Sequence, residues 1–131
     1  MVKEIMMQST DNGIAFFGMQ ADEVRDVSNV EQLGVVIRYV KDNAPVERLV
    51  EFVACQEITG AAICQELLNC LEGLHLDPQV CRAQTYDGAG NIMAGQTNGC
   101  SANLQRVVPN ASYYHCASHS LNLALSKAYA C

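Results

Sequence analysis

The sequence lacks several features that would assign it quickly to a class of protein. No apolar run approaches the roughly 18 residues needed to span a bilayer, and the N-terminus has no signal-peptide h-region. No internal repeat, low-complexity segment or linker is found in the 131 residues. We therefore expect a soluble chain of the size of one domain, in which residues 1–131 form a single, partial domain with an N-terminal lead-in over about residues 1–12.

Basic residues are scarce and unevenly placed. Residues 1–78 carry 13 acidic and 5 basic side chains, whereas residues 79–131 carry 1 acidic and 3 basic side chains. A surface that binds duplex DNA is expected to be basic. If DNA is a partner, other parts of a longer protein must supply most of the contact with it.

The seven cysteines are odd in number, irregularly spaced and not preceded by a secretory signal. These properties disfavour a disulfide framework and favour a reducing, intracellular compartment. Five of the seven cysteines fall in apolar stretches, where thiols usually pack as small core residues.

Hydrophobic periodicity predicts five strands and three helices. The strands are expected at residues 14–22, 31–40, 47–57, 80–87 and 112–117, with a polar loop at 22–29 and a turn at 41–45. In the second strand, Leu33, Val35, Ile37 and Tyr39 should share one face.

The first helix should follow Thr59-Gly60 and fade at Gly73, the second should run from about Ala94 to Pro109, and the third should begin at the N-cap residue Ser120. Their expected apolar stripes are Ile63, Leu67, Cys70, Leu71 and Leu74, then Thr97, Cys100, Leu104 and Val107, then Leu121, Ala124, Leu125 and Ala128.

The predicted element order is β-β-β-α-β-α-β-α. An antiparallel meander followed by alternating units predicts an α/β fold with a mixed sheet, in the element order of the ribonuclease H-like fold. The first and fourth strands lie side by side in such a sheet. Asp22 and Asp87, 65 positions apart, would then face each other.

Two convergent carboxylates suit Mg²⁺ or Mn²⁺, which prefer hard oxygen ligands and leave positions open for water and phosphate. Two such ions could activate a water and hold the leaving oxygen of a phosphoryl transfer. The simpler interpretations are that Asp87 is a turn residue in Asp-Gly and that Asp22 is a solvated loop acid.

Two other motifs are weaker. Gly88-Ala89-Gly90 begins a dinucleotide fingerprint, but Met93 stands where its third glycine is required. Cys116 and His119 have zinc-like spacing, yet a structural zinc site needs four ligands and the chain does not supply the rest. Structural packing is the favoured role of this pair over zinc binding or a Cys–His hydrolase dyad.

Four segments together resemble hAT-type (hobo–Activator) DNA transposases, and more narrowly the transposon-derived MYM-type zinc finger relatives. The segments are ADEVRDVSNVEQL (21–33), RYV (38–40), QTYDGAGN (84–91) and YYHCASHSLNLALSKA (113–128). The resemblance covers nearly the whole chain from Gly13 on, and the HCASHSLNLAL block is its most specific part.

The resemblance implies a ribonuclease H-like catalytic core in a nuclear protein that cleaves and transfers DNA strands. Asp22 and Asp87 match the two metal-binding aspartates of the family, and Cys116 and His119 match a C-x-x-H pair that fixes a strand–helix junction. The third acid lies beyond a helical insertion, downstream of this chain. Two departures, at Val24-Arg25 and in the lengthened stretch Asn91–Gly95, hint at a degenerate copy.

Three interpretations follow: part of a transposase core, a domesticated non-catalytic nuclear module, or an unrelated binding domain. Without the third acid, we expect Mg²⁺ or Mn²⁺ to bind this fragment weakly and the fragment to lack DNA-nicking activity. A third helix cut at Cys131 should leave apolar surface exposed, which favours association into homo-oligomers.

Overall fold

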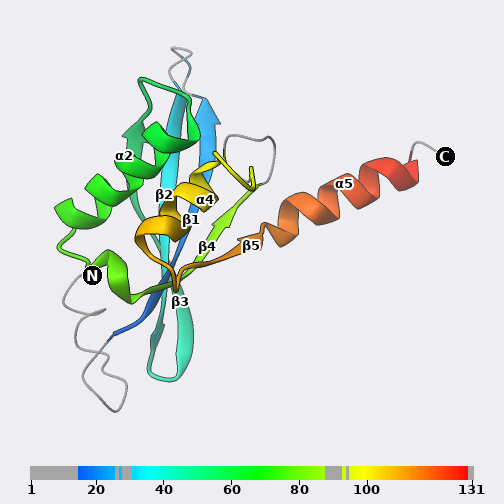
Figure 1. Cartoon of the computed structure of the whole chain (residues 1–131). Coiled ribbons are helices and arrows are strands. Elements are labelled where there is room, and N and C mark those ends of the chain that lie inside the picture. The colour runs from blue at the N-terminus through cyan, green and yellow to red at the C-terminus, as the bar shows by residue number, and fades with distance from the viewer. Residues whose placement is uncertain (1–14, 26, 28–30, 88–92, 94, 130–131) are drawn as a thin grey trace.

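The computed structural model describes residues 15–25, 27, 31–87, 93 and 95–129. In this part of the chain, five strands form one mixed sheet, accompanied by three α-helices and one 3₁₀ turn (Figure 1). The elements are β1 (Phe17–Arg25), β2 (Glu31–Lys41), β3 (Ala44–Ala54), α2 (Gly60–Gly73), η1 (Pro78–Val80), β4 (Cys81–Tyr86), α4 (Cys100–Val107), β5 (Ser112–His115) and α5 (Ala117–Tyr129).

The strand order across the sheet is β3-β2-β1-β4-β5. Strand β1 pairs with β2 antiparallel and with β4 parallel, β2 pairs with β3 antiparallel, and β4 pairs with β5 parallel. The expected meander and the alternating units after it are both present. The prediction of a ribonuclease H-like mixed α/β fold is confirmed.

Strands β2 and β3 are joined by a two-residue turn at Asp42 and Asn43. Both residues have positive φ values, 50° and 61°, as a type I′ hairpin requires. The turn is shorter than the predicted 41–45, so β3 begins at Ala44 and ends at Ala54, three residues earlier at each end than predicted. Pro45 lies inside β3, where it is tolerated because β3 is an edge strand.

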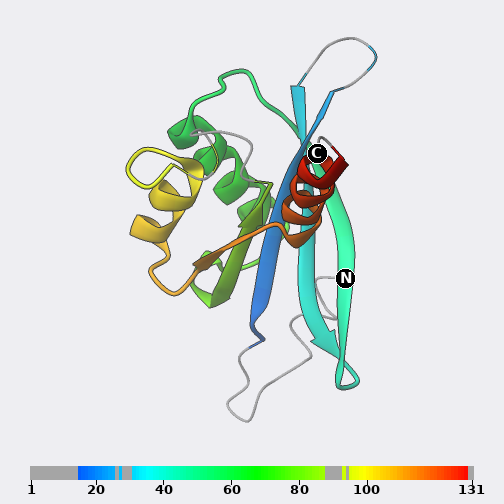
Figure 2. The same ribbon diagram turned by 90° about the vertical axis from the view of Figure 1, so that its right-hand side faces the viewer.

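Helices α2 and α4 cover one face of the sheet, and the core lies between these two layers (Figure 2). The predicted inward face of β2 is confirmed, because Leu33, Val35, Ile37 and Tyr39 are all buried. The neighbouring strand β1 has the same alternation. Its contribution to the core consists of Phe17, Met19 and Ala21.

Helix α2 begins and ends where its sequence signals predict. The Oγ1 of Thr59 accepts a hydrogen bond from the backbone N–H of Ala62 at 3.2 Å, which is a side-chain N-cap. After Gly73, the chain leaves the helix through His75, whose φ is 56°. The predicted stripe is confirmed by its buried members, which are Ile63, Leu67, Cys70 and Leu71.

Two further predicted boundaries, the end of the first strand and the start of the second helix, are wrong. Strand β1 continues to Arg25, so residues 22–25 of the predicted loop are strand, since β2 supplies pairing partners up to Glu31. Helix α4 begins only at Cys100, after a turn at 96–98, and it buries Cys100 and Leu104 while Val107 is exposed. Some residues lie outside those that the structure describes, namely 1–14, 26, 28–30, 88–92, 94 and 130–131. The lengthened stretch Asn91–Gly95, which departs from the family pattern, falls among them except for Met93 and Gly95.

The third helix begins at Ala117, four residues before Leu121, the first helical residue that an N-cap at Ser120 predicts. The backbone N–H of Ser120 donates to the carbonyl of Cys116 at 3.1 Å, so Ser120 lies within the first turn of α5 and is not its N-cap. Helix α5 projects from the body beyond β5 and none of its described side chains is buried (Figures 1 and 2). Among the described residues, no helix is long and apolar enough to cross a membrane.

Candidate functional site

The parallel pairing of β1 with β4 determines where Asp22 and Asp87 lie. The last paired residues in this ladder are Ala21 and Tyr86, and the two aspartates are the next residue on each chain segment. Neighbouring strands lie about 4.8 Å apart. The predicted adjacency of the first and fourth strands is therefore confirmed, and it brings both aspartates to the same rim of the sheet.

Asp22 is placed on the face of the sheet opposite α2 and α4. Ala21 is 1% exposed and points into the core, so the alternation of the strand turns Asp22 to the other side, where it is exposed. Its partner in β2 is Gly34, beside which the side chains of Phe52 and Leu49 lie; a Cβ on Gly34 would stand 3.5 Å from Phe52 and 3.7 Å from Leu49. Apolar side chains thus border this aspartate on one side.

Asp87 is half-buried and its charge reaches Tyr113 of β5. Burial raises the pKa of the Tyr113 phenol, and the negative charge of Asp87 raises it further. The Tyr113 ring stacks on Tyr86 with the ring centroids 6.0 Å apart. Its buried hydroxyl has no hydrogen-bond partner in the structure as described, so an unused donor lies near this carboxylate.

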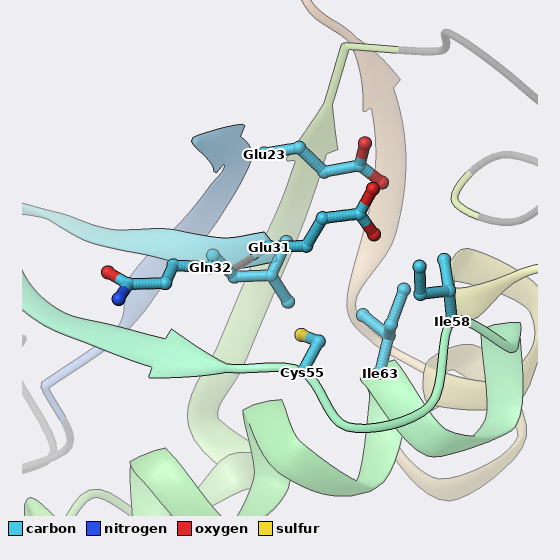
Figure 3. A pocket seen from close by; sticks show the side chains of 7 residues that line it. Glu23, Glu31, Gln32, Cys55, Ile58 and Ile63 are labelled. Carbon is cyan, nitrogen blue, oxygen red and sulfur yellow. The ribbon is translucent and has the colours of Figure 1, made fainter. Parts of the chain in front are cut away.

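A second pair of carboxylates was missed by the sequence reasoning. Glu23 and Glu31 reach toward one another on the helix-facing side of the rim, above Cys55, Ile58 and Ile63 (Figure 3). The register pairs Glu23 with Leu33, two residues from Glu31, so strand alternation alone would have placed both on one face. Burial raises the pKa of the Cys55 thiol, and the charges of Glu66, Glu23 and Glu31 raise it further.

Cys116 and His119 lie at the junction between β5 and α5. The backbone N–H of Cys116 donates to the carbonyl of Tyr86 at 3.0 Å, which ties this junction to the residue that precedes Asp87. The carbonyl of Cys116 accepts from both the backbone N–H and the Oγ of Ser120. The rings of His115 and His119 are 6.3 Å apart.

The donor chemistry at the rim suits a hard divalent cation. Asp22 and Asp87 offer carboxylate oxygens, the ligands that Mg²⁺ and Mn²⁺ prefer, and no soft ligand lies in the pair. Within the described residues, no three His, Cys, Asp or Glu side chains converge to hold a metal ion. Two protein ligands alone would leave most coordination positions to water or phosphate oxygens.

The sheet order and the rim of carboxylates define the class of this protein: it is a ribonuclease-like α/β domain. Residues 1–99 match the family DUF4371, described as the ZMYM1/FAM200 RNase-like domain. The chain belongs to this family, which is related to transposon-derived MYM-type proteins. The match extends over β1 to β4 and so includes both Asp22 and Asp87.

Proposed function

We propose that this chain is part of a catalytic core of the hAT transposase type, in which Asp22 and Asp87 hold a divalent metal ion. One observation carries the proposal: the two aspartates directly follow the last paired residues of adjacent parallel strands. When bound, Mg²⁺ or Mn²⁺ would supply an activated water and charge neutralisation for phosphoryl transfer. The two carboxylates would hold the ion, and water would complete its coordination.

The rest of the rim supports the same proposal. The buried hydroxyl of Tyr113 is a hydrogen-bond donor without a partner in the structure as described, and the charge of Asp87 acts on it. The apolar side chains of Phe52 and Leu49 lie beside Gly34, the partner of Asp22 in β2. Residues 79–131 have a small net positive charge, so contact with DNA would come mainly through other parts of a full-length nuclear protein.

Metal binding can be tested by adding Mn²⁺ and following the broadening of backbone amide signals by NMR. We expect weak binding, with broadening centred on residues near Asp22 and Asp87, that is lost in D22N and in D87N. The matched control is D42N, which removes one charge from the hairpin turn, where asparagine is equally suited. Asp42 lies eight residues along β2 from the partner of Asp22, roughly 26 Å away at 3.3 Å per residue. Broadening centred elsewhere would refute the aspartate pair.

A domesticated, non-catalytic interaction module is the second candidate function. It is favoured by helix α5, where Leu121, Leu123 and Leu125 are all about half-exposed or more. The two candidates differ in activity on DNA. This chain alone is expected not to nick DNA, so the assay uses the full-length protein. Nicking of supercoiled DNA by the full-length protein that requires Mg²⁺ and is lost in D22N would support the catalytic candidate, whereas its absence would support the interaction module.

A further inference from the structure

Two buried cysteines, Cys64 of α2 and Cys100 of α4, lie where these helices pack against each other. A Cβ on Gly60, the first residue of α2, would stand 2.2 Å from the carbonyl oxygen of Asn98 and 2.8 Å from the backbone nitrogen of Cys100. Cys64 follows Gly60 by four residues and so lies on the same helical face. Its thiol and that of Cys100 are hydrogen-bonded to each other, and the two residues are 4% and 0% exposed.

The two thiols are not equivalent. The hydrogen bond from Cys100 lowers the pKa of the Cys64 thiol despite its burial, and the same bond raises the pKa of Cys100. Cys64 is therefore the sulfur of the pair that more readily becomes a thiolate. The other buried thiols differ, since burial raises the pKa of Cys70 to about 12 and that of Cys81 to about 11.

The thiol pair also connects to the strand that carries Asp87. The thiol of Cys100 donates to the Tyr86 hydroxyl at 3.7 Å, and that hydroxyl donates to Oε1 of Gln84 at 2.9 Å. The Nε2 of Gln84 in turn donates to the carbonyls of Ser101 at 3.0 Å and Ala111 at 2.9 Å. A change at Cys100 therefore alters a hydrogen-bond network that includes Tyr86, the residue before Asp87.

We propose that Cys64 and Cys100 form a peroxide-sensitive dithiol that closes into a disulfide joining α2 to α4. The Cys64 thiolate attacks one oxygen of hydrogen peroxide, the O–O bond breaks, and Cys64 becomes a sulfenic acid while hydroxide takes up a proton. The sulfur of Cys100 then attacks the sulfenic sulfur, the S–O bond breaks, and water leaves. Two thiols and one peroxide give one disulfide and two waters, a two-electron oxidation.

Access to the pair does not require global unfolding. The turn at 96–98 is separated from Cys100 only by Gly99, and the residues of the turn are exposed. Short exposed turns open locally at low cost, which would admit a molecule as small as peroxide. The closed form would join the N-terminal parts of α2 and α4, which already touch at Gly60.

The test is peptide mapping of the chain after graded oxidation with hydrogen peroxide, with digestion under non-reducing conditions. We expect one dominant cross-linked peptide pair containing Cys64 and Cys100, reversed by dithiothreitol and absent in C64S. The matched control is C70S, which removes another buried thiol of α2 and should leave the cross-link unchanged.

The chain without substitutions also tests the proposal, which matters if C64S folds poorly, because its oxidised and reduced forms can be compared directly. The oxidised chain should melt at a higher temperature than the reduced chain, since the cross-link restricts the unfolded ensemble. Cross-links spread evenly over other cysteines, accumulation of sulfinic acid at Cys64 without a cross-link, or no oxidation of the pair under conditions that oxidise Cys116 would each overturn the proposal.

Discussion

Replacement of Gly60 by alanine is a sharp test of the packing between α2 and α4. On an open helix the change would stabilise the protein by about 0.5–1 kcal/mol, because alanine loses less backbone entropy. Here the new Cβ would stand 2.2 Å from Asn98 O, 2.7 Å from Gly99 C and 2.8 Å from Cys100 N. These are all backbone atoms, so no flexible side chain can turn away and the two helices must separate.

The expected result for G60A is a loss of about 1–3 kcal/mol in the free energy of unfolding, the usual cost of overpacking. The matched control is Gly73→Ala at the other end of the same helix, where a Cβ would meet nothing within 4 Å. This variant should be unchanged or more stable by up to about 1 kcal/mol. Chemical denaturation followed by circular dichroism measures both. Equal stabilities for the two variants would refute the close approach of α2 and α4.

Three further predictions follow from the core and from α5. Tyr86→Phe should cost about 1–3 kcal/mol in urea denaturation, because Oε1 of buried Gln84 loses its donor. Burial raises the pKa of the Cys81 thiol from 9.0 to about 11, so its contribution to stability is fully present below pH 9. About 2–3 kcal/mol of the free energy of unfolding should be lost as the pH rises through 11. Cys81→Ala should make this loss smaller when unfolding is measured as a function of pH. Leu125→Lys should change stability by less than about 0.5 kcal/mol because the side chain is exposed, and it should reduce any self-association seen by sedimentation velocity.

The structure was predicted most accurately in segments whose hydrophobic pattern fits only a strand or only a helix. In β2 the strict alternation of apolar and polar residues identified the buried face correctly, and in α2 the cap residue and the apolar stripe agreed with each other. The strand order was predictable because few topologies satisfy this sequence of elements. These local and topological signals were sufficient to bring Asp22 and Asp87 to one rim.

The errors arose where tertiary pairing overrides local composition. Residues 22–25 read as a polar loop, yet they remain strand because β2 offers a continuous antiparallel partner and one face of the sheet is open to solvent. Ser120 was predicted to be an N-cap, but its backbone N–H already donates to the carbonyl of Cys116 in the first helical hydrogen bond of α5. The contact of Cys64 with Cys100 was beyond sequence reasoning, because it depends on how closely two helices pack.

Because β1 lies in the middle of the sheet, we expect the two aspartates of the candidate metal site to differ in mobility. Asp22 lies within the antiparallel ladder with β2, where Gly34 is its partner and pairing continues to Arg25, whereas Asp87 follows the last paired residue of β4. Amide deuterium exchange should accordingly be slow at Asp22 and faster at Asp87. The Asp22 carboxylate is thus expected to be held more rigidly than the Asp87 carboxylate. A change that alters the distance between the two carboxylates should therefore act mainly by moving Asp87.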